Sequence, residues 1–288
     1  MTELISSPIN VPRILVDSSL GFAVSADMRH PPHGVETIGV AIFCHGFSGA
    51  KYPSLTDGLA SVGFLTLSID FPGYGGTLPG SGRVLPSEQM HIVREFGAYA
   101  EDKLMQRAKL PIVLLGAALG GSVALHAAVG NPRFNAFVLA HPLASGEAFL
   151  RRKYPDAESW TAFWAKVDRA QRTGGKLHRT DIATLTTGLQ SYLPRDTAME
   201  FNPEFAKEFC ETAPSDAIAA VAPRRVLVIH CDGDSMITTK EVRALVDASN
   251  GNATLHLLEG GEHFIFEYPH VVRLTCDWLL AAIAPHGS

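Results

Sequence analysis

The chain has 288 residues, of which 46% are hydrophobic and 18% charged, a composition typical of a globular protein with a sizeable core. Its formal net charge of -5 leaves no basic excess to neutralise phosphates, so a nucleic-acid binder is not expected. Residues 1–16 lack a signal-peptide pattern and no apolar run is long enough to cross a membrane, so we expect a soluble, cytoplasmic protein with no membrane partner.

Strands and helices are predicted to alternate along most of the chain. The expected strands, in chain order, are residues 13–16, 21–26, 37–44, 64–69, 111–115, 136–140, 225–230 and 254–258. The expected helices are residues 52–62, 87–109, 119–129, 239–248 and 269–283. Continuous apolar runs such as TIGVAIFC at 37–44 are typical of strands buried on both faces. The predicted fold class is therefore α/β: a mostly parallel, eight-stranded sheet with helices on both faces.

Residues 143–216 interrupt this alternation. They contain no convincing buried strand and are expected to form short helices, with Gly174, Gly175 and Pro194 between them. Because the stretch is inserted between two core strands, we predict a helical lid at 143–216 over a core formed by 1–142 and 217–288. Ligands of such sheets bind beyond the carboxyl ends of the strands, which is where the motifs below fall.

The first motif, Gly116-Ala117-Ala118-Leu119-Gly120, joins a predicted strand to a predicted helix. A nucleophile elbow holds its central residue in a strained turn, and small residues two positions away on either side let strand and helix approach closely. The motif resembles the G-x-S-x-G elbow of the α/β-hydrolase superfamily, with Ala118 where that superfamily has its serine nucleophile. The alternative is a generic strand-to-helix turn whose glycines serve packing.

The segment His45-Gly46-Phe47 ends another predicted strand and resembles the H-G-x segment of the same superfamily. That resemblance implies an oxyanion hole formed by the backbone N–H groups of Phe47 and Leu119. The side chain of His45 is expected only to shape the loop. The glycine-rich segment 70–77, which resembles the D-x-x-G-x-G-x-S loop, is also interpreted as structural.

Two motifs supply the remaining members of a catalytic triad. The segment 230–237 (HCDGDSMI) resembles the acid loop and places Asp234 at the acid position, although Cys231 and Thr238 depart from the usual glycine and proline. Asp232 remains the competing acid. After the last strand, His263 matches the histidine of the superfamily, and the resemblance implies a general base that Asp234 holds in the required tautomer.

The resemblance covers residues 35–142 and 217–285, with five motifs in the correct order. The segment HGFSGAK and the helical insert are more narrowly similar to cinnamoyl- and feruloyl-esterase-like members. The implied function is hydrolysis or transfer of a carboxylic ester or thioester by a Ser-His-Asp triad.

Ala118 leaves three interpretations open, because without a serine oxygen no acyl-enzyme can form. In the favoured one, a natural serine has been replaced by design, and the chain as given is inactive or strongly impaired. In the second, alanine is natural and His263 acts as a base in a lyase, a cyclase or a C–C bond-cleaving enzyme. In the third, the chain is a non-catalytic ligand-binding homologue.

The insert gives clues to the substrate. Trp160, Phe163 and Trp164 fall on one helix face, and with Phe149 they are predicted to form an apolar substrate-binding wall, unless that face only packs the lid. Residues 151–180 hold eight basic side chains against three acidic ones, so an acyl-carrier protein or a CoA-type anionic group is a possible partner, with a solvated helix face as the alternative. The four cysteines form no C-x-x-C pair and no cofactor motif occurs, so neither a cofactor nor a metal is expected.

Overall fold

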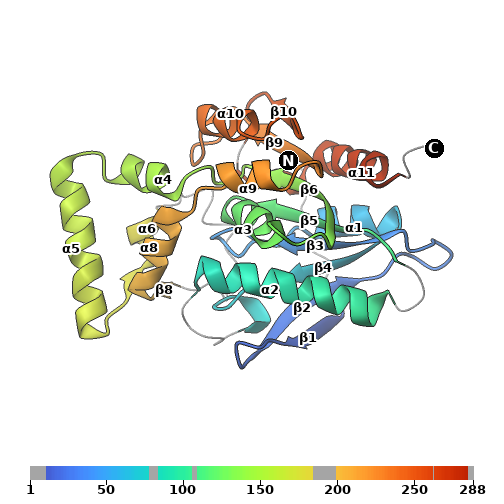
Figure 1. The fold of residues 1–288 in the computed structure, drawn as a ribbon, viewed down its shortest axis with the longest axis horizontal. Coiled ribbons are helices and arrows are strands. Elements are labelled where there is room, and N and C mark those ends of the chain that lie inside the picture. The colour runs from blue at the N-terminus through green and yellow to red at the C-terminus, as the bar shows by residue number, and fades with distance from the viewer. Residues whose placement is uncertain (1–10, 78–83, 106–108, 184–198, 262, 285–288) are drawn as a thin grey trace, which may run out of the picture.

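The computed structural model describes residues 11–77, 84–105, 109–183, 199–261 and 263–284. Eight strands form one sheet in the order β1-β2-β4-β3-β5-β6-β9-β10 (Figure 1). Their bounds are β1 Arg13–Asp17, β2 Ala23–Arg29, β3 Gly39–Cys44, β4 Phe64–Ile69, β5 Ile112–Ala117, β6 Phe134–Ala140, β9 Arg225–Cys231 and β10 Ala253–Leu258. Strand β2 pairs antiparallel with β1 and β4, and the other pairs are parallel. The predicted fold class is confirmed.

Helices cover both faces of the sheet, and each face has its own apolar core. On one face lie α1 (Pro53–Ser61) and α11 (Pro269–Ile283). On the other lie α2, α3, α9 and α10, with bounds Pro86–Tyr99, Leu119–Ala128, Ser215–Ala220 and Thr239–Asp247. The central strands send alternate side chains into the two cores, which is why they read as unbroken apolar runs in the sequence.

The helix expected at residues 87–109 is shorter in the structure. Helix α2 ends at Tyr99 and continues as a π-helical turn, Ala100–Leu104, in which the Met105 N–H donates to the Ala100 carbonyl at 3.1 Å. This wider turn closes the helix before the chain enters β5.

Between β6 and β9 the chain forms the inserted segment. Its elements are α4 Gly146–Lys153, α5 Ala157–Thr173, β7 Leu177–His178, α6 Arg179–Ile182, β8 Glu200–Phe201 and α8 Pro203–Glu211. These elements lie together at one end of the sheet (Figure 1). The two-residue strands β7 and β8 pair antiparallel and are too short to leave a sequence signal. Pro194 lies outside the described residues.

The predicted boundary between residues 216 and 217 falls inside α9, which packs on α3 and α10 of the core. The inserted segment is tied to the core by Arg152, which donates to the Met236 carbonyl at 2.6 Å. A second tie runs from the Ser87 N–H to the Glu208 carboxylate at 2.8 Å. That the segment acts as a lid domain stays a prediction. In the described part of the chain, no helix has the length and apolar character needed to cross a membrane.

Candidate active site

The turn between β5 and α3 holds Ala118 in an unusual backbone conformation, with φ of 48° and ψ of −119°. The flanking glycines allow this turn to close. A Cβ on Gly116 would lie 2.5 Å from the Gly120 carbonyl oxygen, and a Cβ on Gly120 would lie 2.1 Å from the Cys44 carbonyl oxygen. No larger residue fits at either position without moving the backbone. A positive φ at a non-glycine residue is uncommon and is found most often at functional sites.

The loop after β3 lies directly against this turn, since a Cβ on Gly46 would lie 3.1 Å from the Ala118 Cβ. The Phe47 carbonyl accepts hydrogen bonds from the Tyr74 hydroxyl and from Arg179 Nη2, both at 2.9 Å, which fixes the orientation of this loop. Among the described residues, neither the Phe47 N–H nor the Leu119 N–H donates to a backbone carbonyl. Leu119 is the first residue of α3, where the helix dipole is positive. That these two groups form an oxyanion hole stays a prediction.

His45 is buried behind this loop and links it to the next one. Its Nδ1 lies 2.8 Å from the Gly46 carbonyl oxygen, and its Nε2 accepts a hydrogen bond from the Phe71 N–H at 3.1 Å. Burial lowers the pKa of His45 to about 4, so the ring stays neutral. Asp70 supports the same region by accepting a hydrogen bond from the Gly76 N–H at 3.0 Å. Both side chains serve the loops, as the sequence indicates.

Asp234 and His263 form a buried pair at the carboxyl edge of the sheet. His263 Nδ1 lies 2.8 Å from Asp234 Oδ2. The other carboxylate oxygen, Oδ1, accepts hydrogen bonds from the Met236 and Ile237 N–H groups at 2.7 and 3.2 Å. Asp232 instead accepts from the Gly260 N–H at 2.6 Å and is exposed. Of the two candidate acids, the structure thus brings only Asp234 to His263.

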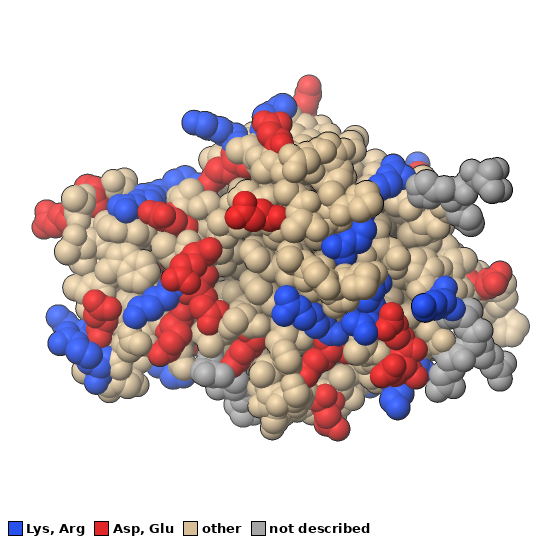
Figure 2. Space-filling view, viewed as in Figure 1, with Lys and Arg blue, Asp and Glu red and all other residues tan. Residues whose placement is uncertain are grey.

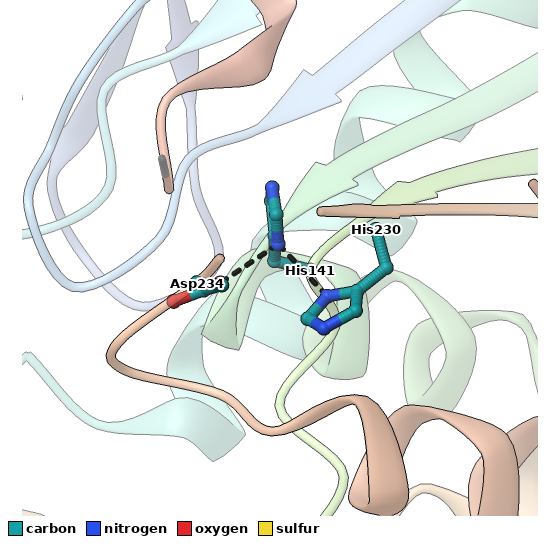
Figure 3. A group of neighbouring side chains, drawn as sticks. All are labelled: His141, His230 and Asp234. Carbon is teal, nitrogen blue, oxygen red and sulfur yellow. Dashed lines mark hydrogen bonds and ion pairs between the residues drawn. The ribbon is translucent and has the colours of Figure 1, made fainter. Parts of the chain in front are cut away.

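Two further histidines, which no sequence motif assigns to the site, lie beside Asp234 (Figure 3). His141 Nδ1 lies 2.7 Å from Asp234 Oδ2 and 2.9 Å from His230 Nδ1. His141 follows β6 and His230 lies near the end of β9, and these strands are neighbours in the sheet. The two histidines could have been found from the sequence by pairing those strands, since parallel neighbours bring their carboxyl ends together.

His141, His230 and Asp234 also have the residue types of a metal site, with one ligand atom from each within 4.8 Å of the others. However, the separations of 2.7 and 2.9 Å that involve His141 are those of hydrogen bonds. Asp234 Oδ2 in addition receives the hydrogen bond from His263. A hydrogen-bond network therefore accounts for these contacts without a metal ion.

The network fixes the charges of its members. Burial by itself raises the pKa of Asp234, but the hydrogen bonds from His141 and His263 outweigh it and hold that pKa far below its usual range. Burial also lowers the pKa of His141 to about 4, against the opposing effect of Asp234. At neutral pH the arrangement is thus one buried carboxylate that accepts hydrogen bonds from two imidazoles.

A pocket with about 550 Å³ of free space, its open mouth included, lies over these groups. Of the predicted site residues, Phe47, Ala118, Leu119, Phe149 and His263 line it. Its other apolar walls are formed by Leu143, Ile182, Phe209 and Met236, with Arg179 among them. The arrangement thus combines a base, a pair of N–H donors and an apolar cavity at one place.

Trp160, Phe163 and Trp164 are not among the residues that line this pocket, and their role in substrate binding stays a prediction. Their rings contact one another along α5 in edge-to-face and tilted arrangements, and Phe163 stacks on Tyr154 with ring centroids 4.6 Å apart. This face of α5 packs within the inserted segment, which agrees with the alternative interpretation that the face only packs the lid.

Comparison with known proteins gives the family. Residues 41–273 match the model of the alpha/beta hydrolase family, and the chain belongs to it. An uncharacterized 31.7 kDa protein of the traX-finO intergenic region of Escherichia coli is 22% identical over 283 residues, covering 92% of this chain and 98% of that protein. A monoglyceride lipase homolog of monkeypox virus is 28% identical over 114 residues, covering 37% of this chain and 38% of that protein.

Solved structures of low sequence identity share the fold. DcsB in complex with its substrate analogue has a TM-score of 0.79 at 16% identity, covering 96% of this chain and all of that one. Est1E of Butyrivibrio proteoclasticus with bound ferulic acid has a TM-score of 0.68 at 17% identity, covering 94% of this chain and all of that one. A monoglyceride lipase variant of Saccharomyces cerevisiae has a TM-score of 0.73 at 15% identity, covering 99% of this chain and 98% of that one.

Proposed function

We propose that the chain is the alanine form of a serine hydrolase that acts on a carboxylic ester or thioester, with position 118, Asp234 and His263 as its triad. The observation that carries this proposal is the backbone conformation of Ala118. Its φ of 48° suits a nucleophile elbow, and Ala118 lines the same pocket as His263. Esterases and lipases among proteins of the same fold lend support. The engineered replacement of a natural serine accounts for a complete site around a missing nucleophile.

With a serine at position 118, each group has a defined task. The Nδ1–H of His263 donates a hydrogen bond to the Asp234 carboxylate, which leaves Nε2 to accept the proton of the serine hydroxyl. The serine oxygen attacks the carbonyl carbon, and the N–H groups of Phe47 and Leu119 bind the oxyanion. Collapse expels the alcohol or thiol, which takes the proton from His263. Water, or another acceptor in the case of acyl transfer, then releases the acyl group by the same steps.

The test is to compare the chain with its Ala118→Ser variant on a panel of p-nitrophenyl esters and acyl thioesters. We expect hydrolysis to rise by about 1000-fold or more in the serine form, because the nucleophile is the one missing member of a unit. Adding His263→Ala to that form should abolish the gain. Ala117→Ser, which puts the hydroxyl one residue away from the elbow position, is the matched control and should show no gain. A folded Ala118→Ser protein that is inert on the whole panel contradicts the proposal.

A second candidate is a serine-independent lyase, cyclase or C–C bond-cleaving enzyme in which His263 acts as the base. The alanine itself favours it, because His263 and Asp234 form their pair although position 118 carries no hydroxyl group. In that case the chain with alanine turns over its own substrate, and His263→Ala abolishes that activity. A non-catalytic binding protein, by contrast, retains its ligand unchanged in both the alanine and the serine form.

A surface partner for the inserted segment remains a proposal with less support. Of its eight basic side chains, Arg151, Arg152 and Lys166 form ion pairs with Glu147, Glu241 and Asp181. On the face seen in Figure 2, acidic side chains lie between the basic ones at the end of the molecule that carries α5. A carrier protein or a CoA-type group therefore meets a mixed surface rather than a uniformly basic one.

A further inference from the structure

We propose that Arg179 forms a subsite for a carboxylate that the substrate carries in addition to its ester or thioester bond. This inference rests on the proposed function for the chemistry at Ala118, and it adds the substrate class: half-esters or half-thioesters of dicarboxylic acids. It comes from a buried cation in the wall of the pocket, whose charge no described residue balances.

The position of Arg179 is fixed by its backbone. It is the first residue of α6, and its N–H donates to the Met199 carbonyl at 2.7 Å. Its side chain crosses to the core, where the guanidinium carbon lies 4.6 Å from the centre of the Phe47 ring. Arg179 is 3% exposed and lines the pocket together with Ala118 and His263. The cation thus belongs to the cavity and not to the molecular surface.

Most of the donors on Arg179 are unused. Nη2 donates to the Phe47 carbonyl at 2.9 Å, and the Tyr74 hydroxyl, which donates to the same carbonyl, lies beside the guanidinium. Nε and Nη1 are buried and have no hydrogen-bond partner among the described residues. In the parts of the chain that the structure describes, no carboxylate forms an ion pair with it. The nearest acid along the chain, Asp181, pairs with Lys166 at 2.7 Å and caps the His178 N–H at 2.9 Å. Burial lowers the pKa of Arg179, yet a guanidinium remains protonated at neutral pH.

A buried charge without a counter-ion is unfavourable unless a ligand supplies one. The groups around Arg179 in the pocket wall are apolar, including Ile182, Ala183 and Phe209. An anion that enters this wall therefore meets a cation in a medium of low polarity, where a charged hydrogen bond is strong. The planar guanidinium suits the planar carboxylate.

The location also limits the ligand. Arg179 binds the carbonyl of Phe47, and the N–H of the same residue is the predicted oxyanion donor. The carboxylate subsite and the reacting carbonyl are therefore close neighbours, and a short acyl chain joins the two. This arrangement selects for the acyl part of the substrate and leaves the alcohol or thiol part unspecified.

The alternative role of Arg179 is structural: it would only hold the inserted segment against the loop that contains Phe47. The ratio of the affinities for a charged and a neutral ligand distinguishes the two roles. The chain with Ala118 forms no acyl-enzyme, so its binding of monobenzyl glutarate and of the neutral carboxamide analogue can be measured by calorimetry at pH 7. We expect the carboxylate to bind at least about tenfold more tightly than the carboxamide, as for one hydrogen-bonded ion pair.

In Arg179→Gln this ratio should fall to about one, and Arg179→Lys should keep part of it. The matched control is Arg243→Gln, which removes an exposed arginine of α10 and should leave the ratio unchanged. If Arg179 had only the structural role, Arg179→Gln would weaken the binding of both ligands equally. An unchanged affinity ratio therefore overturns the proposal. A ratio of one in the unsubstituted chain also overturns it, as does tighter binding of an analogue with a phosphate in place of the carboxylate.

This experiment does not depend on catalysis. If Ala118→Ser fails to hydrolyse any ester while the affinity ratio is lost in Arg179→Gln, the proposed function fails and the carboxylate subsite stands. If Ala118→Ser hydrolyses neutral esters and the affinity ratio is one, the carboxylate subsite fails and the proposed function stands.

Discussion

Ala118 holds a strained backbone conformation, with φ of 48°, that an alanine side chain does not require. The conformation persists because three hydrogen bonds determine it: the Ala118 N–H donates to the Ala140 carbonyl, and the Ala118 carbonyl accepts from Gly121 and Leu143. Strain of this kind costs on the order of 1–3 kcal/mol and is maintained where a function requires it. The proposed function gives a reason for this conformation, namely a nucleophilic side chain at position 118.

His141 is expected to act as a positioning residue for the triad. In the Ala118→Ser form, His141→Phe removes one of the two imidazole donors to Asp234 and should lower kcat about tenfold with little change in KM, which corresponds to a lost charged hydrogen bond. A rise in KM as large as the fall in kcat would speak against this role.

His45 should make the protein less stable in mild acid. Its pKa is lowered from 6.5 to about 4 by burial, so between these values the unfolded chain binds a proton that the folded chain does not. The free energy of unfolding should fall by about 1.4 kcal/mol per pH unit on this account as the pH drops from 6.5 to 4. Urea denaturation at pH 7 and pH 5 measures the slope. His45→Gln should flatten it by about one proton, whereas His256→Gln, which removes an exposed histidine, should not.

At the scale of elements, the contact between α3 and the end of β3 sets the geometry of the elbow. Gly120→Ala would drive a methyl group to 2.1 Å from the Cys44 carbonyl oxygen, so we expect it to cost more than about 3 kcal/mol of stability. Gly121→Ala is the control, because its methyl group meets nothing closer than Pro142 Cβ at 3.3 Å and lies in a helix that prefers alanine. Chemical denaturation should show a large loss for the first variant and a small change for the second. Similar losses in both would place the constraint elsewhere.

Among the described aromatic residues of the inserted segment, Phe149 and Phe209 line the pocket, whereas Trp160, Phe163 and Trp164 pack on each other. Phe149→Ala should weaken the binding of a benzyl ester by about tenfold or more, because it removes a wall of the cavity. Trp164→Ala should lower thermal stability and leave that affinity unchanged, since its ring contacts those of Trp160 and Phe163. Calorimetric titration of both variants checks the contrast. A loss of affinity in Trp164→Ala would restore the interpretation that the α5 face binds the substrate.

For the whole molecule, the sequence predicts the sheet and the strand ends well, because buried parallel strands are unbroken apolar runs and each crossover must be covered. Asp234 and His263 follow from their places after the last two strands. His141 follows only once β6 and β9 are known to be neighbours, and Arg179 does not follow at all. Their roles arise from contacts across 93 and 132 positions of sequence, with Asp234 and Phe47. Neither contact leaves a local pattern. Likewise, the spacing of Trp160, Phe163 and Trp164 predicts an apolar face and not what that face contacts.

A bound ester should stabilise the molecule as a unit. The pocket is lined from both the core and the inserted segment, and the ties through Arg152 and Glu208 hold the two together. At an ester concentration of 100 times Kd, stability should rise by about 2.7 kcal/mol, which is roughly 5 °C in Tm for a chain of this size. In the proposed mechanism the alanine form does not cleave its ligand, so the shift in Tm should persist through hours of incubation, whereas in Ala118→Ser it should decline as the ester is consumed. Differential scanning calorimetry after timed incubation measures both. A shift that declines equally in the two forms would mean that alanine does not prevent turnover, and the serine-independent mechanism would then replace the triad.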